Sequence, residues 1–357
     1  MRPPVVLPLG REAQGWVRLG GSPSRTGWAH RLMLHWQSYW FERSLSLQRS
    51  LPQAPPLEHD PIFVLGLWRS GTTYLHEMLG ACPGLLHPAT WQCMNAANFR
   101  LRQKPVATAS VQRPMDGFTI DAFSPQEDEF ALLALGVPSV YRGFLDPRRI
   151  PELTQLLDPD SWSCDRPPGW MTLWREFLDG VVAGNPGRLV LKSPAHSFRI
   201  RALAEGFPNG SFVWLVRDPV ETFLSNRKMW LAMFERYAFW EWNSTVLDQF
   251  LLRAFARAAE SLSLATSLLP KERLVVVEFD RMVRAPLDTL EGLNRRLHLV
   301  DWKSSQPVLE KIIANKANYR HVDHLPAILS DVTIDAAKKL RMEQHSARSS
   351  HGLSISV

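Results

Sequence analysis

The segment FVLGLWRSGTTYLHEML at residues 63–79 constrains the fold of this chain more than any other part of its sequence. An apolar run leads through a short turn, which contains Gly71, into an amphipathic helical pattern. Where a buried strand turns into a helix in this way, backbone N–H groups and the positive end of the helix converge on one point. The segment therefore predicts an anion-binding loop at the end of a strand.

Three further apolar runs, at residues 188–192, 211–216 and 273–279, are similar to the first strand at 61–66 and predict buried parallel strands. Helical patterns separate the four runs. This alternation predicts a doubly wound α/β sheet. With the loop after the first strand, we expect a P-loop-like, three-layer α/β/α fold around a central, mainly parallel sheet. Ligands of such sheets bind at the carboxyl ends of the strands.

The composition excludes several classes of protein. With 357 residues, 45% of them hydrophobic, the chain can form a core that needs no disulfides or metal ions. Its three cysteines have neither metal-ligand nor CxxC spacing, and a reducing cytoplasm fits them best. The sequence has no signal-peptide pattern and no run of about 18 apolar residues, so we expect a cytoplasmic protein without a membrane span. The net charge of +6 is modest, and binding of a small anionic ligand is enough to account for it. We therefore expect no nucleic-acid partner.

Residues 25–49 are predicted to form a helix with a strongly aromatic side. The residues on this side are Trp28, Leu32, His35, Trp36, Tyr39 and Trp40. We interpret it as a surface packed on the main domain, because aromatic stripes at helical spacing usually belong to a core. A surface that faces lipid or substrate is the alternative.

The turn at residues 69–73 differs from the phosphate loops of ATP- and GTP-binding proteins. Those loops normally follow the pattern G-x-x-x-x-G-K-[ST], and a carboxylate from another strand helps to bind magnesium. This chain lacks the lysine and has an arginine before the turn, and a guanidinium can bind a tetrahedral anion without a metal. We expect Arg69, Ser70, Gly71, Thr72 and Thr73 to bind the anion; an ordinary strand-to-helix turn is the alternative.

Two other predicted strands also end in basic residues. Lys192 ends one strand, and Arg217 ends the next, where Asp218 is expected to cap the following helix. Ser225 lies four residues beyond Glu221 on the same side of that helix, so we expect Arg217 and Ser225 to hold a second anion. Two anion sites at neighbouring strand ends indicate a nucleotide with phosphate groups at both ends of its ribose.

With these motifs the sequence resembles the sulfotransferases that use 3′-phosphoadenosine 5′-phosphosulfate (PAPS). In that family a loop of the RSGTT kind holds the 5′-phosphosulfate, and an arginine with a serine in the next helix holds the 3′-phosphate. RSGTT at 69–73 and RDPVETFLS at 217–225 match both motifs, and the resemblance spans residues 61–297. It looks closest to a bacterial branch similar to tyrosylprotein sulfotransferases, through PATWQCMN at 88–95, SPQEDEFAL at 124–132, LKSPAH at 191–196 and PNGSFVWLVRDP at 208–219.

The resemblance implies transfer of a sulfuryl group from PAPS, without a metal, to a hydroxyl or amine acceptor, with PAP as the second product. Lys192 matches the family lysine that contacts the sulfuryl group and the leaving oxygen. We expect a small-molecule, glycan-like or lipid-like acceptor, which would allow peripheral membrane contact, and the oligomeric state is open. The implied segments are an N-terminal helical extension and linker at 1–57, a sulfotransferase domain at 58–335, and a C-terminal helix end and polar tail at 336–357.

The proton acceptor of this chemistry is expected to differ from the commoner scheme of the family. Relatives often have a glutamate after the TW pair, where this chain has Gln92, and an amide cannot act as a general base. The acidic cluster SPQEDEF provides the leading candidates, Glu127 and Asp128, and His196 and His87 are the alternatives.

A structural role for the same acidic cluster stays open. Ser124, Pro125 and Glu127 match a helix N-cap, a proline in the first turn and a capping-box glutamate. In that interpretation Glu127 would stabilise a helix end and would not take part in the reaction.

Two other functions remain as alternatives. A metal-dependent P-loop phosphotransferase would require a Gly-Lys-Ser/Thr loop and a carboxylate for magnesium at a strand end, and we find neither pattern in the sequence. A non-catalytic nucleotide-binding relative would keep the fold without the chemistry, and Gln92 is consistent with it.

Overall fold

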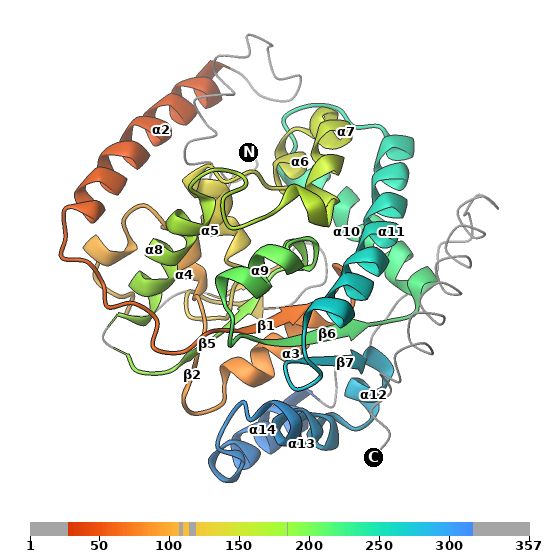
Figure 1. Ribbon diagram of the computed structural model, residues 1–357. Helices are drawn as coiled ribbons and strands as arrows, with labels where there is room; N and C mark the ends of the chain where they lie inside the picture. The colour runs from red at the N-terminus through yellow and green to blue at the C-terminus, as the bar shows by residue number, and fades with distance from the viewer. Residues whose placement is uncertain (1–27, 107–109, 114–118, 184, 317–357) are drawn as a thin grey trace.

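A five-stranded parallel sheet forms the centre of the computed structural model, which describes residues 28–106, 110–113, 119–183 and 185–316 (Figure 1). The strand order is β2-β5-β1-β6-β7. The strands are β1 (Ile62–Leu65), β2 (Leu85–Leu86), β5 (Arg188–Lys192), β6 (Ser211–Val216) and β7 (Leu274–Glu278), and β3 (Val111–Gln112) pairs with β4 (Thr119–Ile120) in a small antiparallel sheet. The predicted fold class and the four predicted strands are confirmed. Strand β2 was missed because two residues are too few to give an apolar pattern.

The helices cover both faces of the main sheet. The α-helices are α2 (Trp28–Arg49), α3 (Thr72–Gly80), α4 (Thr90–Met94), α5 (Glu129–Leu135), α6 (Arg142–Leu145), α7 (Ile150–Leu153), α8 (Trp170–Val182), α9 (Ile200–Gly206), α10 (Pro219–Tyr237), α11 (Ser244–Leu268), α12 (Phe279–Arg284), α13 (Pro286–Leu297) and α14 (Trp302–Lys316). Short 3-10 helices are η1 (Phe99–Leu101), η2 (Pro147–Arg149), η3 (Thr154–Leu157), η4 (Pro159–Ser161) and η5 (Pro194–Phe198).

Alternate side chains of each strand pack into different layers. Phe63 of β1 packs against Trp174 of α8, at 6.3 Å between ring centroids, on the face that α8 and α9 cover. Its neighbour Val64 packs on the opposite face with Leu75 of α3 and Leu293 of α13. Full burial of such a side chain stabilises the fold by about 1.5–3 kcal/mol, which is why these strands read as continuous apolar runs.

The register of the sheet brings three strand ends together. Strand β1 lies between β5 and β6, with Val64 opposite Lys192 and Leu65 opposite Trp214. Because all three strands run parallel, the loop after β1 and the residues that end β5 and β6 meet at one edge of the sheet.

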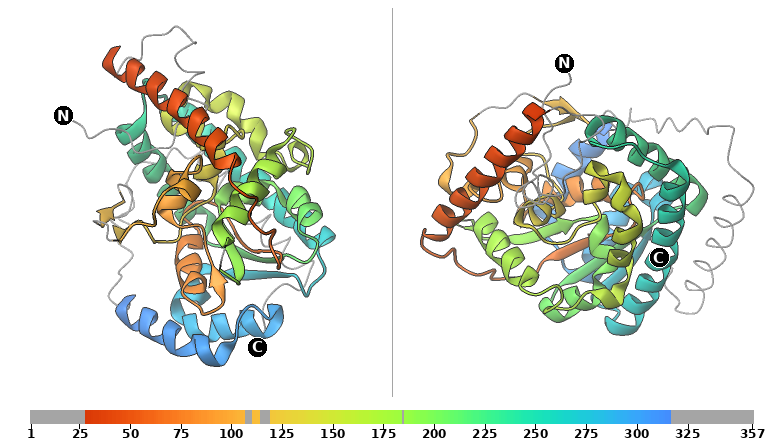
Figure 2. Two further views of the ribbon diagram at one scale, coloured as in Figure 1. Left: turned by 90° about the vertical axis from the view of Figure 1, so that its left-hand side faces the viewer. Right: turned by 90° about the horizontal axis from the view of Figure 1, so that it is seen from above.

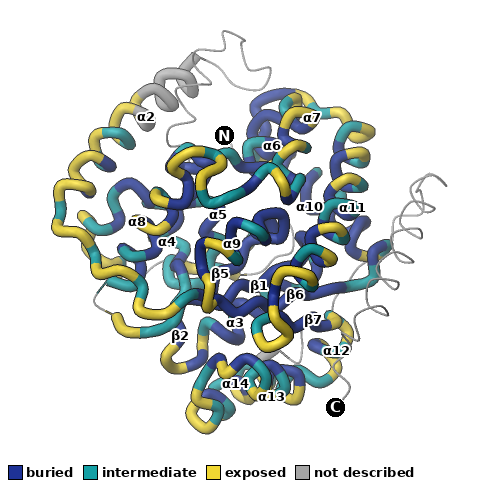
Figure 3. Tube along the Cα trace, viewed as in Figure 1, coloured by how far each residue is buried: buried dark blue, intermediate teal, exposed yellow. Residues whose placement is uncertain are grey.

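Helix α2 lies at the periphery in the two views of Figure 2. In its second half Leu45 and Gln48 are buried, and the Gln48 side chain donates to the carbonyl oxygen of Ala96 at 2.9 Å. Three residues of its predicted aromatic side do not pack as we expected: Trp36, Tyr39 and Trp40 are 65%, 59% and 45% exposed. The side chains of Trp28, Leu32 and His35 lie outside the part of the structure that is described. Figure 3 marks exposed residues in yellow along the described part of this helix.

The predicted chain ends are only partly visible. Residues 336–357 lie outside the described residues, so the segment boundaries stay predictions. Among the helices that the structure describes, none combines the length and the apolar character needed to cross a lipid bilayer.

Candidate active site

The loop between β1 and α3 has the geometry of an anion site. The first N–H groups of an α-helix have no partner within the helix, and at α3 they follow directly after Gly71. Gly71 has φ 94°, and a Cβ atom here would lie 2.3 Å from the ring of Phe279. Arg69 also has a left-handed backbone, with φ 65°. Ser70, in contrast, closes the turn through its hydroxyl, which donates to the carbonyl oxygen of Leu67 at 2.7 Å.

Helix α10 and Arg217, which precedes it, hold this loop from the side. The Asn226 side chain donates to the carbonyl oxygen of Trp68 at 2.7 Å, and the Arg217 guanidinium donates to the carbonyl oxygen of Arg69 at 3.2 Å. The Arg69 side chain in turn donates through Nε to the hydroxyl of Ser225 at 3.0 Å. The two predicted anion sites therefore form one connected unit. No sequence motif pointed to Asn226, because an amide inside a helix has no motif of its own.

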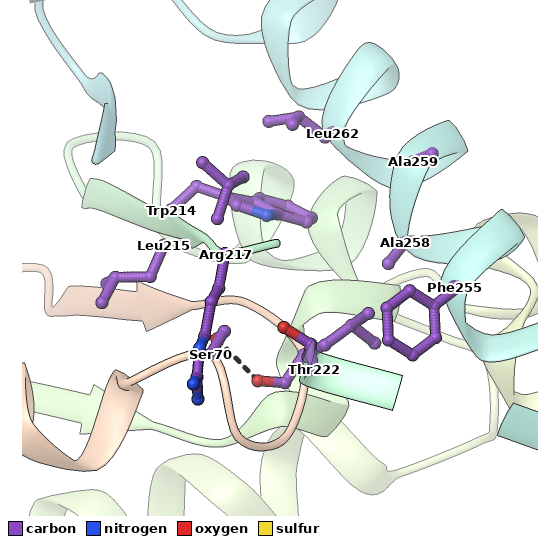
Figure 4. A pocket seen from close by; sticks show the side chains of 11 residues that line it. Ser70, Trp214, Leu215, Arg217, Thr222, Phe255, Ala258, Ala259 and Leu262 are labelled. Atoms are coloured by element: carbon purple, nitrogen blue, oxygen red, sulfur yellow. Dashed lines mark hydrogen bonds between the residues drawn. The ribbon is translucent and has the colours of Figure 1, made fainter. Parts of the chain in front are cut away.

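The Arg217 side chain lies where β6 ends and α10 begins. Asp218 caps α10, as expected, by accepting from two backbone N–H groups at 2.9 and 3.1 Å. The Arg217 guanidinium donates to the Glu221 carboxylate at 3.0 Å and lies 4.6 Å from the centroid of the Phe279 ring. Figure 4 shows Arg217, Ser70 and Thr222 around a small pocket that apolar side chains of β6 and α11 complete. Sequence reasoning missed Phe279, because only contact with Gly71 and Arg217 gives it significance.

A second group of side chains centres on Glu127. The Lys192 ammonium donates to Glu127 Oε1 at 2.5 Å and to the hydroxyl of Thr73 at 3.3 Å. The Tyr141 hydroxyl donates to Glu127 Oε2, and the indole N–H of Trp68 donates to the Tyr141 hydroxyl at 3.0 Å. The Lys192 side chain is only 4% exposed and that of Glu127 13%. Glu127 is thus the more accessible member of the ion pair.

Burial sets the protonation of this group. It lowers the pKa of Lys192 from its ordinary value, although the neighbouring Glu127 carboxylate opposes this effect. Burial also raises the pKa of Tyr141 well above its ordinary value, and the Glu127 charge adds to the shift. The Tyr141 hydroxyl therefore remains a neutral hydrogen-bond donor.

The capping-box interpretation of Glu127 is not supported. Helix α5 begins at Glu129, and the residue that precedes it, Asp128, makes no side-chain cap. The Ser124 hydroxyl is engaged with the Asp121 carboxylate at 2.9 Å. Glu127 instead points to Lys192 and Tyr141 from a non-helical segment.

Asp128 and His196, which we predicted as catalytic, lie in the core. Both side chains are fully buried, and His196 Nε2 lies 2.9 Å from the Asp128 carboxylate. The Trp174 indole N–H donates to the same carboxylate at 2.7 Å, and the Arg199 guanidinium reaches His196 Nδ1 at 3.2 Å. Since Nδ1 accepts from Arg199, we assign the ring hydrogen to Nε2, which donates to Asp128. Neither group is open to an acceptor, so we withdraw both as bases.

The electrostatics of Asp128 agree with a structural role. Burial disfavours its charged form, but His196, Trp174 and Arg199 outweigh that effect and place the pKa of Asp128 below its ordinary value. Next to it, Glu129 forms a buried pair with Arg199 through contacts of 2.6 and 3.0 Å. Such paired buried charges rigidify the support beneath the site.

Gln92 and the last candidate for the base, His87, are also engaged. The side-chain oxygen of Gln92 accepts from the N–H of Ala89 at 2.9 Å and so caps α4. His87 Nε2 lies 3.2 Å from the carbonyl oxygen of Phe123, and burial lowers the pKa of this ring. Of the predicted bases, only Glu127 is both partly exposed and adjacent to Lys192.

Comparison with known proteins decides the family. The model of the sulfotransferase family matches residues 61–304, which include the loop, both strand ends and Glu127. The chain belongs to the sulfotransferase family. It is therefore a sulfotransferase enzyme with a P-loop-like α/β fold, as the resemblance implied.

Two sequence relatives of this sulfotransferase are mycobacterial. The omega-hydroxy-beta-dihydromenaquinone-9 sulfotransferases Stf3 of Mycobacterium bovis and of Mycobacterium tuberculosis are each 28% identical to it over 264 residues. Each alignment covers 73% of this chain and 68% of the relative.

Solved structures show the same fold. The sulfotransferase STF9 from Mycobacterium avium superposes with a TM-score of 0.68 at 19% identity, covering 99% of this chain and 93% of that one. The sulfotransferase STF1 from Mycobacterium tuberculosis H37Rv gives a TM-score of 0.60 at 19% identity, covering 94% and 92%.

Proposed function

We propose that this sulfotransferase transfers the sulfuryl group of PAPS to a hydroxyl group of a lipid-like acceptor, using Glu127 as general base. The observation that carries the proposal is the convergence of the anion loop, Lys192 and Glu127 at one edge of the sheet. Thr73 belongs to the loop and contacts Lys192, so a donor bound by the loop would present its reacting end to the ion pair.

The roles follow from charge and position. Arg69 and the N–H groups at the start of α3, with Gly71, Thr72 and Thr73, would bind the 5′-phosphosulfate. Ser70 would support them by closing the turn. Arg217 and Ser225 would bind the 3′-phosphate, with the Arg217 guanidinium turning from Glu221 toward the phosphate.

The transfer itself needs one base and one cation. The acceptor oxygen forms a bond to sulfur while the bond from sulfur to the bridging phosphate oxygen breaks. The hydroxyl proton goes to Glu127, and Lys192 neutralises the charge that develops on the bridging oxygen. Positioning and charge stabilisation account for the chemistry.

A lipid-like acceptor is favoured over a glycan or an amine by two observations. The relatives Stf3 are named for a hydroxylated dihydromenaquinone. In addition, Trp36, Tyr39 and Trp40 form an exposed aromatic cluster on α2. The ring centroid of Trp40 lies 5.9 Å from that of Trp36 and 5.7 Å from that of Tyr39. Tryptophan and tyrosine rings of this kind suit the boundary between water and lipid.

Thermal unfolding with ligands tests the nucleotide. PAP should stabilise the protein, and ATP with magnesium at the same concentration should not; a ligand at 100 times its dissociation constant adds about 2.7 kcal/mol. Arg69→Ala and Arg217→Ala should lose the shift, and Arg295→Ala, an exposed arginine on α13, should keep it. Stabilisation by ATP and magnesium alone would replace this proposal by the phosphotransferase alternative.

Turnover tests the acceptor and the metal. PAP formation from PAPS would be measured with ω-hydroxy-β-dihydromenaquinone-9, simple primary alcohols, sugars, amines and a tyrosine peptide, each with and without EDTA. We expect a hydroxylated lipid to be preferred and EDTA to have no effect. Membership of the tyrosylprotein-like branch stays a prediction, and preference for the peptide would favour it. PAP binding without turnover on any acceptor would favour the non-catalytic alternative.

A further inference from the structure

Four side chains from separate parts of the chain form one line of hydrogen bonds at the site. Trp68 follows β1, Tyr141 immediately precedes α6, Glu127 precedes α5 and Lys192 ends β5. The indole N–H of Trp68 lies 3.0 Å from the Tyr141 hydroxyl, that hydroxyl contacts Glu127 Oε2, and Lys192 contacts Glu127 Oε1 at 2.5 Å.

The direction of these hydrogen bonds is fixed by the chemistry of the groups. An indole N–H can only donate, so the Tyr141 oxygen must accept from Trp68. The Tyr141 hydrogen is then available to Glu127, and the raised pKa of the tyrosine keeps that hydrogen in place. Each carboxylate oxygen of Glu127 therefore receives one donor, and each retains a lone pair for a further hydrogen bond.

We propose that Tyr141 is a positioning residue that holds the Glu127 carboxylate as an oriented anion beside Lys192, and that Trp68 fixes the Tyr141 hydroxyl. The inference rests on the proposed role of Glu127 as general base. It goes further because it assigns a role to two residues that no sequence motif indicated.

Glu127 needs such support because of where it lies in the chain. It belongs to a non-helical segment, where its backbone N–H donates to the side chain of its neighbour Gln126 at 2.9 Å. A base that is misplaced by about 1 Å can lose on the order of 10²-fold in rate. Gln92 caps α4 and cannot act as the base, so the reaction depends on the placement of Glu127.

The Tyr141 ring is itself rigidly held. It stacks on Phe144 at 4.9 Å between centroids and contacts Phe130 at 5.3 Å, and the residue is only 2% exposed. Trp68 is bonded through its carbonyl oxygen to Asn226 and directly precedes Arg69 of the anion loop. The segment that would bind the donor anion thus also fixes the residue that orients the base.

A double-mutant cycle in the full-length protein tests this role. The variants are Tyr141→Phe, Glu127→Gln and the double variant, with Trp68→Phe as a second way to weaken the same contact. Tyr237→Phe on α10 is the control for removal of a tyrosine hydroxyl outside the site. The measurements are kcat and KM for PAPS with ω-hydroxy-β-dihydromenaquinone-9, the affinity for PAP, and urea unfolding of all variants.

Tyr141→Phe should lower kcat by about 10- to 100-fold and leave the KM for PAPS and the affinity for PAP unchanged. Trp68→Phe should cause a smaller loss in the same direction. Tyr141→Phe should cost little further activity in the Glu127→Gln background, because Tyr141 acts through Glu127. An equal loss in both backgrounds, or a native kcat, would show a packing role only and overturn the proposal.

The split between kcat and KM is a readout that a packing role would not produce. Tyr141→Phe removes one of the two donors that hold the Glu127 carboxylate and leaves the loop at 69–73 intact. A rise in the KM for PAPS as large as the fall in kcat would contradict the proposal.

The outcomes separate this inference from the proposed function. A native kcat in Glu127→Gln alone would remove Glu127 as the base, and the role of Tyr141 would fall with it. If the native protein shows no turnover, the proposed function fails, and the unfolding free energies then test whether Tyr141 supports Glu127. Energetic coupling between Tyr141→Phe and Glu127→Gln would support that contact, and strictly additive effects would overturn it.

Discussion

Lys192 shows at the scale of a single residue how burial and a neighbouring carboxylate act on a lysine at a strand end. Burial disfavours its charge, and the Glu127 carboxylate at 2.5 Å offsets part of that effect. A cation in such a place is available for charge that develops on a nearby oxygen, because little water competes for it.

Replacement of Lys192 by methionine should therefore affect the reaction and not the nucleotide. We expect Lys192→Met to lower kcat by about 10²- to 10³-fold, the usual cost of losing one charge-stabilising donor. The affinity for PAP, measured by calorimetry, should stay within about twofold, because a product without the sulfuryl group does not need the lysine. Lys271→Met, at an exposed position, is the control, and unchanged turnover would remove Lys192 from the mechanism.

At the scale of elements, the position of the anion loop depends on three segments that are distant in sequence. Helix α10 bonds to the loop through Asn226 and Ser225, Arg217 bonds to it from the end of β6, and Phe279 at the start of α12 packs against Gly71. The strand-to-helix motif thus creates the loop, and its neighbours fix its conformation.

Gly71→Ala should disturb this arrangement. The new Cβ would lie 2.3 Å from Phe279 and the φ of 94° would be strained, so we expect loss of about 1–3 kcal/mol of stability and at least tenfold weaker PAP binding. Urea unfolding and calorimetry measure the two effects.

Gly84→Ala separates the clash from the strain. Gly84 also has a positive φ, 82°, but a Cβ there would meet nothing within 4 Å. This control should lose some stability and keep PAP binding. Equal loss of binding in both variants would show that Phe279 does not matter for the loop.

At the scale of the whole molecule, buried histidines make stability depend on pH. His76 of α3 is 1% exposed, with Nε2 3.2 Å from the carbonyl oxygen of Val190 on β5. Burial, Lys192 and His87 lower its pKa well below the ordinary value of 6.5. The unfolded chain then binds more protons than the folded protein below pH 6.5, so stability should be full above that pH and fall as the pH falls.

His76→Gln should reduce this acid sensitivity. Glutamine retains a donor for Val190 and does not titrate, so the fall in the unfolding free energy from pH 7 to pH 5.5 should shrink by on the order of 1 kcal/mol. Urea unfolding at several pH values measures it, with exposed His59→Gln as control. An identical pH dependence in native and variant protein would exclude His76 as the cause.

The outer side of α2 leads to a prediction for the molecule as a whole. Trp36, Tyr39 and Trp40 are exposed with Arg43 beside them, and the chain has a net charge of +6. We expect binding to anionic phosphatidylglycerol vesicles in a sedimentation assay, and a loss of at least about fivefold in the Trp36→Ala, Trp40→Ala double variant.

A control at another exposed apolar residue, Leu268→Ala of α11, should leave vesicle binding unchanged. Equal binding by the native protein and the double variant would refute a role for the aromatic cluster. Self-association that disappears in the double variant, measured by light scattering, would show instead that a second copy covers this surface.

The sequence by itself determined the sheet, the anion loop and the two basic strand ends. Each of these features depends on a short stretch of sequence. An apolar run is long enough to be a buried strand, and the residues that directly follow it must lie at the end of that strand. The family followed from the same motifs, because the loop and strand-end sequences together resemble those of PAPS-dependent sulfotransferases. The positions of Lys192 and Arg217 at strand ends could thus be predicted from the sequence.

Only the tertiary structure decided which acidic residue lies beside Lys192. Glu127 and Asp128 are adjacent in sequence, yet one contacts Lys192 and Tyr141 while the other is buried against His196 and Trp174. One-dimensional patterns do not show which way a side chain points from a non-helical segment. The partners come from positions 14 to 68 residues away, and packing alone brings them together.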